Sequence, residues 1–170
     1  MMSNFKIWRL VKLIFLVFSL SACSEDDELA MEAVHLTANV EGEKFEVNSN
    51  KGTMRGEKRL SAIGTVDLTV KAEDDQGKSI EFLIFNYNGK NSYPIGAGFF
   101  NDNWIRFSQT SPEGIWAASR SSGTSTILIN SIEITSDDGQ RIKGHFSFEG
   151  RESKDSSRRL VTDGDFDLSL

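Results

Sequence analysis

Apolar and polar residues alternate along most of the chain beyond residue 33. From Val34 to Val40 every second side chain is apolar, and the side chains between them are polar. Because successive side chains of a β-strand point to opposite faces of a sheet, this period of two predicts a strand with one buried face. Gly42 then provides a turn, and the apolar face resumes at Phe45 and Val47. The segment therefore predicts a β-hairpin.

The same pattern predicts further strands in the middle of the chain. One of them contains a bend or bulge at Gly64 and ends at a turn over Asp74-Asp75-Gln76-Gly77. Its apolar positions are Ala62, Val66, Leu68 and Val70. The next segment, Ser79 to Tyr87, is apolar on both faces, which predicts a strand covered on both sides. These faces carry Ile80, Phe82 and Ile84 on one side and Leu83, Phe85 and Tyr87 on the other.

The C-terminal part predicts three more strands. A β-bulge at Asn130-Ser131 would keep four isoleucines on the core side, namely Ile127, Ile129, Ile132 and Ile134. Asp137-Asp138-Gly139 supplies a hairpin turn. The strand after this turn is expected to place Ile142, Gly144, Phe146 and Phe148 inward and Arg141, Lys143, His145 and Glu149 outward. The last strand is expected to place Leu160, Thr162, Phe166, Leu168 and Leu170 inward.

Many short strands separated by turn residues predict an all-β fold. The pattern fits either an antiparallel β-sandwich or an open β-barrel of about 8–10 strands, which alternation alone does not distinguish. Residues 33–170 are long enough to bury a core and predict a single domain.

The first 22 residues have a different composition. Three cations, Lys6, Arg9 and Lys12, precede an uncharged apolar stretch from Leu13 to Leu20. This layout is typical of a cleaved secretory signal. The stretch is also too short to remain as a membrane span, which needs about 20 apolar residues.

The signal ends in Leu20-Ser21-Ala22-Cys23, and Cys23 is the only cysteine of the chain. Small residues before a cysteine are typical of bacterial lipoproteins, which are cut before that cysteine and lipidated on it. We therefore expect residues 1–22 to be removed and residues 23–32, with the acidic run Ser24 to Glu28, to form a tether. Lipid on Cys23 would hold the protein on the membrane. The alternative is an ordinary cleaved signal that leaves a free thiol.

Charge narrows the range of partners. The whole chain has a net charge of −6, and loss of the three signal cations leaves 16 Lys and Arg against 25 Asp and Glu, a net charge of −9. Nucleic acid is therefore not an expected partner. A single lipidated cysteine forms no internal disulfide, so the stability of the domain must come from its core.

The search for catalytic or metal-binding residues is mostly negative. The alternation places His35 and His145 on outward faces, and they show no spacing typical of zinc ligands. Asp163, Asp165 and Asp167 alternate, but they lack the glycine and distal acid of a calcium loop and are expected to form the solvent face of the last strand. No G-x-S-x-G motif is present, although a Ser-His-Asp arrangement stays open. We expect no enzyme activity, no metal and no cofactor.

The region from Asn86 to Trp116 combines aromatic rings with amide and carboxylate groups. Rings that stack and polar groups that bond hydroxyls are the chemistry of sugar sites. The candidate ligand-binding residues are Tyr87, Tyr93, Trp104 and Trp116. The competing explanation is that these aromatic side chains belong to the core and that the asparagines serve turns.

Several segments together resemble a family of small Bacteroidota lipoproteins of unknown function. They are the Leu20 to Cys23 motif, the acidic Ser24 to Glu28 run, Thr37 to Phe45 (TANVEGEKF), Tyr93 to Gly96, Ile142 to Phe148 (IKGHFSF) and Thr162 to Phe166 (TDGDF). The resemblance implies lipidation and attachment to the outer membrane, facing the cell exterior. It assigns no activity and no site residue.

Three functional hypotheses follow. The favoured hypothesis is a structural or accessory lipoprotein of the cell envelope. It would dock to a protein partner through the segment Ser79 to Tyr87, which is apolar on both faces. The second is a glycan or small-ligand binding module that uses the Asn86 to Trp116 region. The third is a hydrolase whose site the sequence does not reveal.

Overall fold

We analysed a computed structural model that describes residues 34–96, 102–119 and 130–170. Residues Ala33–Leu170 form one compact unit. The described residues contain 11 strands: β1 His35–Val40, β2 Glu43–Asn48, β3 Thr53–Leu60, β4 Val66–Glu73, β5 Ser79–Ile84, β6 Asn91–Pro94, β7 Trp104–Thr110, β8 Glu113–Ala118, β9 Ser131–Asp137, β10 Arg141–Glu152 and β11 Arg158–Ser169. Within these ranges no helix is long and apolar enough to cross a membrane.

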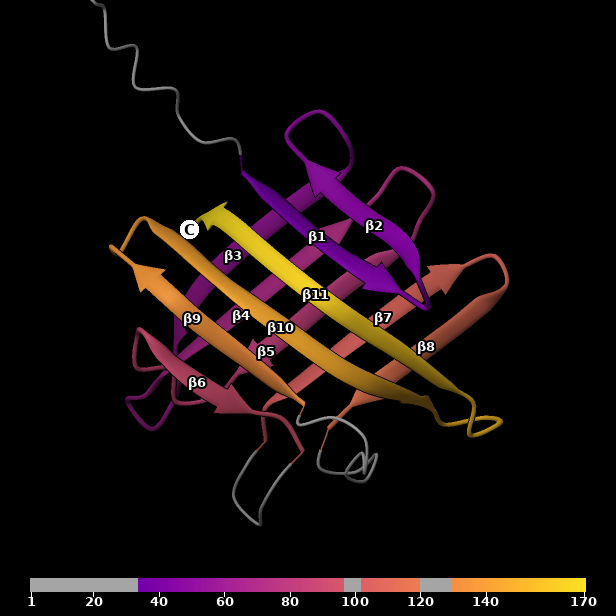
Figure 1. Cartoon of the computed structure of the whole chain (residues 1–170). Helices are drawn as coiled ribbons and strands as arrows, with labels where there is room; N and C mark the ends of the chain where they lie inside the picture. The colour runs from indigo at the N-terminus through magenta and orange to yellow at the C-terminus, as the bar shows by residue number, and fades with distance from the viewer. Residues whose placement is uncertain (1–33, 97–101, 120–129) are drawn as a thin grey trace, which may run out of the picture. The chain divides into compact units, whose positions relative to one another are not determined.

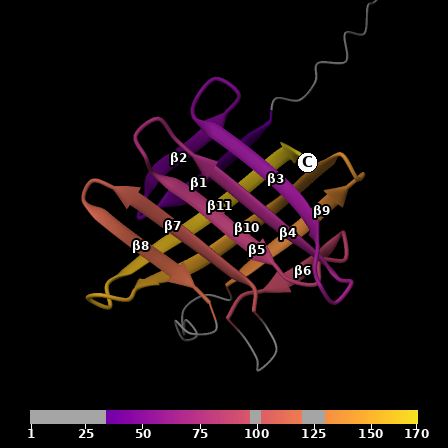
Figure 2. The same ribbon diagram turned by 180° about the vertical axis from the view of Figure 1, so that it is seen from behind.

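The strands form one antiparallel, nearly closed, barrel-shaped sheet. Its main path runs β2-β1-β11-β10-β8-β7-β5-β4-β3, while β9 pairs with β10 and β6. The layer of β1, β2, β9, β10 and β11 faces the viewer in Figure 1, and the layer of β3, β4, β5, β7 and β8 faces the viewer in Figure 2. The prediction of an all-β fold is confirmed, with 11 strands instead of about 8–10.

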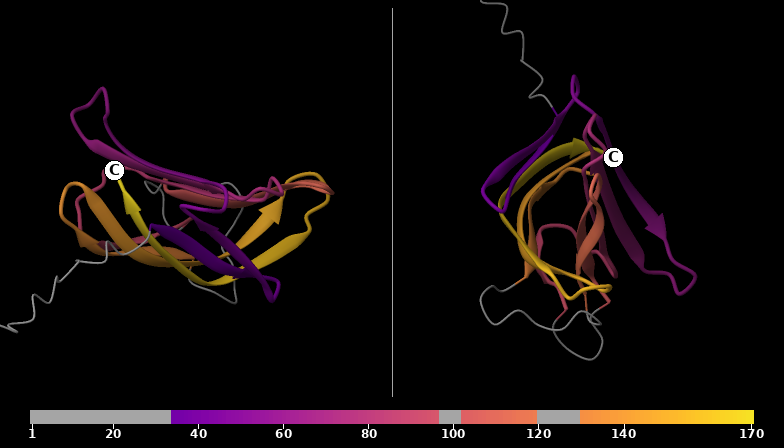
Figure 3. Two further views of the ribbon diagram at one scale, coloured as in Figure 1. Left: turned by 90° about the horizontal axis from the view of Figure 1, so that it is seen from above. Right: turned by 90° about the vertical axis from the view of Figure 1, so that its right-hand side faces the viewer.

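Strand β10 joins the two layers. One of its edges pairs with β11 from Arg141 to Arg151. Its other edge pairs first with β9 and then, at Arg151 and Glu152, with β8 of the opposite layer. The layers therefore face each other across the core while remaining parts of one sheet, as the two views of Figure 3 show.

The core lies between the two layers. Phe82 of β5 is fully buried, and its ring centroid lies 5.4 Å from that of Phe166 in β11 and 6.4 Å from that of Phe146 in β10. These three rings connect the layers at the middle of the barrel. The other large side chains that are fully buried are Phe107, Phe148, Leu36, Leu68, Ile80, Ile84, Ile105, Ile132, Ile134 and Ile142.

Three predicted turns are confirmed. Glu41 and Gly42 join β1 to β2 as a two-residue loop, and both have positive φ (53° and 84°), which matches the twist of a hairpin. Asp74 accepts the N–H groups of Gln76 and Lys78 between β4 and β5. Asp138 likewise accepts two backbone N–H groups between β9 and β10.

The orientation predicted for the start of the last strand is wrong. Asp163 has a φ of 51°, and a β-bulge at this point inserts one extra residue of β11 against both β1 and β10. The bulge reverses the alternation. Val161 is therefore buried, whereas Leu160 is 37% exposed and Thr162 points outward. Beyond the bulge, Phe166 and Leu168 are buried, and Leu170 packs against the core, as predicted.

Two predictions for the middle of the chain also need correction. Ala62 lies in the turn between β3 and β4 instead of in a strand, and it is exposed. Strand β5 ends at Ile84 and is covered on only one face, because Leu83 is half-buried and Phe85 is 41% exposed. Tyr87 is buried, but it lies beyond the end of β5.

Some predictions lie outside the described residues. These are the signal over residues 1–22, lipid attachment at Cys23, the tether over residues 23–32, and the positions of Ile127 and Ile129 relative to the bulge at Asn130-Ser131.

Candidate functional site

Three of the four predicted ligand-binding aromatic residues belong to the core. Tyr87, Tyr93 and Trp116 are 8%, 7% and 6% exposed. The rings of Tyr87 and Tyr93 stack with their centroids 5.7 Å apart, and Trp116 stacks on Phe107 at 5.9 Å. The structure therefore does not gather the four side chains at one surface.

The polar atoms of these buried aromatic residues are satisfied internally. The Tyr93 hydroxyl donates to the Gly89 carbonyl at 2.8 Å and accepts the Asn88 N–H at 2.9 Å. The Trp116 indole N–H donates to Ser157 Oγ at 2.9 Å. Internal partners of this kind allow Tyr and Trp to be buried.

Trp104 is the exception, since it is half-buried on the outer face of β7. Its Cα partner in the neighbouring strand is Leu83, and the Arg106 guanidinium lies 5.1 Å from its ring centroid. With the exposed Phe85 just beyond the end of β5, these residues form an apolar strip, beside which Arg106 pairs with Glu81. We call Leu83, Phe85 and Trp104 the outer strip.

A polar cluster at one end of β5 was not predicted. Lys58 Nζ of β3 donates to both carboxylate oxygens of Asp137 in β9 at 2.8 Å, and the Tyr87 hydroxyl donates to Asp137 Oδ2 at 2.7 Å. Burial of Asp137 works against its ionisation, but the bonds from Lys58 and Tyr87 outweigh burial and lower the pKa of the carboxyl. Burial and the hydrogen bond to Asp137 raise the pKa of Tyr87. The cluster links β3, β9 and the segment after β5.

The two histidines lie at outward-facing positions, as predicted, and both contact the carboxylate of Asp165. His35 Nε2 is 2.6 Å from Asp165 Oδ1, and His145 Nδ1 is 2.9 Å from Asp165 Oδ2. Within the part of the chain that the structure describes, no group of three or more His, Cys, Asp or Glu side chains could hold a metal ion. The arrangement is a hydrogen-bonded triplet across β1, β11 and β10.

The other two aspartates of β11 have separate partners. Asp163 accepts the side-chain amide of Asn39 at 2.8 Å. Asp167 is 4% exposed and pairs with Arg141 and with Lys143, the latter at 3.0 Å. The prediction that all three aspartates form a solvent face is therefore wrong for Asp167, because these two cations cover it. The alternating carboxylates do not converge on one point.

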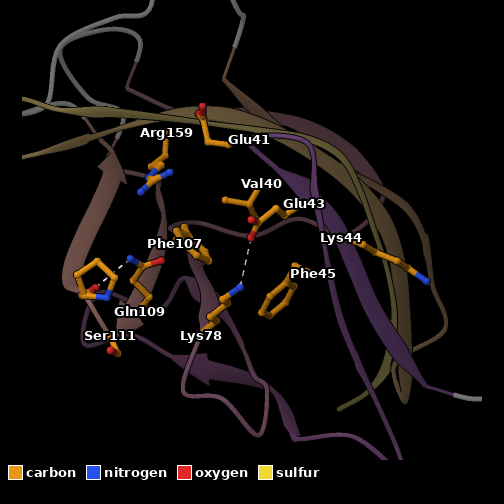
Figure 4. Close-up of a pocket in the computed structure, with 11 residues that line it drawn as sticks. Val40, Glu41, Glu43, Lys44, Phe45, Lys78, Phe107, Gln109, Ser111 and Arg159 are labelled. Atoms are coloured by element: carbon orange, nitrogen blue, oxygen red, sulfur yellow. Dashed lines mark hydrogen bonds and ion pairs between the residues drawn. The ribbon is translucent and has the colours of Figure 1, made fainter.

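A cavity of about 300 Å³ lies where the β1–β2 hairpin passes the ends of β7 and β11 (Figure 4). Its apolar wall consists of the exposed Pro112 and of Val40, Phe45 and Phe107, which are at most 9% exposed and belong to the core. Its polar lining consists of Glu41, Glu43, Lys44, Lys78, Gln109, Ser111 and Arg159. The cavity thus combines a hydrophobic wall with groups of both charges.

The charged groups of the cavity differ in how well they are paired. The Glu41 carboxylate accepts the backbone N–H of Leu160. Glu43 is 80% exposed at its side chain and lies 3.5 Å from Lys78 Nζ. Arg159 lies over the Trp116 ring at 4.8 Å, and among the described residues no hydrogen bond or ion pair to its guanidinium is found.

In comparisons with known proteins, the chain matches no protein-family model, no curated protein and no solved structure.

The sequence alone did not indicate the polar cluster at Asp137. Lys58 lies opposite the buried Leu68, but only the pairing of β3 with β4 in the structure shows this. The sequence also did not indicate that Arg159 points inward. Arg159 has the same inward phase as Val161, but the bulge at Asp163 shifts the alternation between these residues and the rest of β11.

Proposed function

We propose that this chain is a lipid-anchored accessory protein of the bacterial cell envelope. The observation that supports the anchor is the Leu20-Ser21-Ala22-Cys23 motif after a short apolar stretch. Two or more acyl chains on Cys23 would suffice for stable attachment, at about 0.8 kcal/mol for each buried CH₂. The acidic run that follows, Ser24 to Glu28, supports export to the outer face of the outer membrane.

The accessory role rests on the outer strip. Leu83, Phe85 and Trp104 place apolar surface on the outside of the barrel, where it makes no contribution to the core. Contiguous exposed apolar surface on a soluble domain often marks a contact with another protein. The outer strip is therefore the face through which we propose that the barrel meets an envelope partner.

The glycan-binding alternative has less support. Of the aromatic residues on which it depended, only Trp104 is accessible, and Arg106 already lies over its ring. A sugar could stack on Trp104 only at the edge of the outer strip. This alternative proposes that a glycan, instead of a protein partner, binds the same face.

Replacing Cys23 by Ser is expected to abolish lipid attachment. Cells that express the full chain should incorporate labelled palmitate into it, and the Cys23→Ser variant should carry none and leave the membrane fraction, because the serine hydroxyl cannot replace the thiol as acceptor. A Ser24→Ala variant should behave as the unmodified chain. Label retained by Cys23→Ser would contradict the proposed anchor.

A photo-crosslinking residue at position 85 is expected to capture a defined envelope protein on intact cells. The matched control carries the same residue at position 133, where Glu133 is exposed on the outer face of β9 in the other layer. A discrete adduct from position 85 but not from position 133 supports the outer strip as the docking face. Equal adducts from both positions, or none from either, would count against it.

A further inference from the structure

The cavity beside Arg159 has the chemistry of a binding site for a small organic anion. Its location follows from strand alternation: Arg159, Gln109 and Lys78 continue the inward faces that Val161, Phe107 and Ile80 begin. Side chains on an inward face are normally apolar in such a barrel. Here three polar side chains from three different strand ends replace them around one space.

The opposite end of β5 shows what a purely structural polar cluster looks like in this barrel. There Lys58 and Tyr87 also point inward, but both are bonded to Asp137 at 2.7–2.8 Å. In the cavity, by contrast, the Arg159 guanidinium lies over the face of Trp116, and no hydrogen bond or ion pair to it is found among the described residues. A guanidinium carries donors in a fork that matches a carboxylate, and stacking on an indole leaves the edge of that fork available. The end of the cavity at which Arg159 lies is therefore cationic.

The remaining lining decides the kind of anion. Val40 and the exposed Pro112 supply apolar surface to the cavity, which suits an apolar body, whereas Phe107 and Phe45 are each only 2% exposed and belong to the core. Glu41 and Glu43 lie at the rim and would repel a doubly charged group such as phosphate. Figure 4 shows Arg159, Phe107 and Lys78 around the shared space, with Lys44 directed away from it.

We propose that this cavity binds a small monocarboxylate with an apolar body. The carboxylate contacts the Arg159 guanidinium, and the apolar body packs on Val40 and Pro112. Lys78 adds a second positive charge, and its ammonium lies 3.5 Å from the Glu43 carboxylate. The site is separate from the outer strip and does not depend on the lipid anchor or on an envelope partner.

The test uses fluorine NMR of para-fluorobenzoate with the full chain in a nonionic detergent. Para-fluorobenzamide serves as a neutral probe of nearly the same shape. Because a hydrogen bond between charged groups contributes more than a neutral one, the acid is expected to bind about tenfold more tightly than the amide. Arg159→Met should weaken binding of the acid about tenfold and leave binding of the amide unchanged.

A matched control is Lys71→Met, which removes a cation from β4 that does not line the cavity. The Lys71 ammonium pairs with Glu73 at 2.7 Å, so this variant should bind the acid as the unmodified chain does. Lys78→Met provides a second variant that leaves the contact of Arg159 with Trp116 intact, and it should also weaken binding of the acid. If Arg159→Met does not fold, binding of the acid by Lys78→Met tests the proposal.

Several results would overturn the proposal. They are no binding of the acid at millimolar concentration, equal affinity for acid and amide, an equal loss in Lys71→Met and Lys78→Met, or competition by inorganic phosphate that is stronger than competition by acetate.

Discussion

Phe82→Ala is expected to lower the free energy of unfolding by about 3–5 kcal/mol, the range for removing a buried aromatic ring. Phe82 is fully buried and contacts Phe166 and Phe146 of the opposite layer. Its removal loses the favourable free energy of transferring the ring from water to the core. It also leaves a cavity, because strand pairing prevents the two layers from moving together to fill the space. Denaturant unfolding of the full chain, followed by tryptophan fluorescence, measures the change.

The matched control for this prediction is Phe85→Ala. The same change of side chain, three residues away, removes a ring that is 41% exposed, so the effect should stay within about 0.5 kcal/mol. Equal losses for the two variants would show that Phe82 does not connect the layers as described. A change in the slope of the unfolding curve would instead indicate an altered unfolded state.

Asp137→Asn is expected to lower the free energy of unfolding by about 2–3 kcal/mol at neutral pH, somewhat below the range for a fully buried ion pair. The substitution leaves the Lys58 ammonium without its counter-charge, while Tyr87 loses a charged acceptor. Lys58 is 27% exposed at its side chain, so water partly compensates for the loss. Thermal or denaturant unfolding measures the change.

The effect of Asp137→Asn should depend on pH with a definite sign. The pKa of Asp137 is lowered in the folded state, so its ionised form stabilises the fold fully above the ordinary carboxyl pKa of about 3.9. This contribution is lost as the pH falls through the lowered pKa. The difference between the two proteins should therefore be constant near neutral pH and should shrink in acid.

Asp75→Asn is the control for the pH series, because Asp75 is an exposed turn residue. Its stability should follow that of the unmodified chain at every pH. If the Asp137→Asn difference grew in acid, the carboxylate would not be the stabilising form, and the account of the cluster would be wrong.

Local patterns predicted the strands and turns whose causes are local. The hairpin at Glu41-Gly42 requires only two residues that tolerate positive φ. The turn at Asp74 requires only that its carboxylate accept the N–H groups of Gln76 and Lys78. Alternation fails where a strand contains an extra residue. The bulge at Asp163 changed the phase of β11, and no residue type there distinguishes a bulge from regular pairing.

The candidate sites could not be predicted for a different reason. Lys58 and Asp137 are 79 residues apart in sequence and meet only because β3 and β9 belong to opposite layers. The burial of Tyr87, Tyr93 and Trp116, which the sequence offered as candidate ligand-binding residues, has a related cause. Each of these side chains finds its polar partner through the fold, so burial that is unfavourable for an isolated hydroxyl or indole becomes acceptable.

The pairing of β1 with β11 sets the order in which the barrel can be completed. Among the described strands, β1 lies between its hairpin neighbour β2 and the far later β11, so one edge of β1 stays open until β11 has been made. Contacts of such long sequence separation form late, because a long loop must close first. The hairpins made of neighbouring strands can form earlier, but the barrel cannot be completed before β11 has been made.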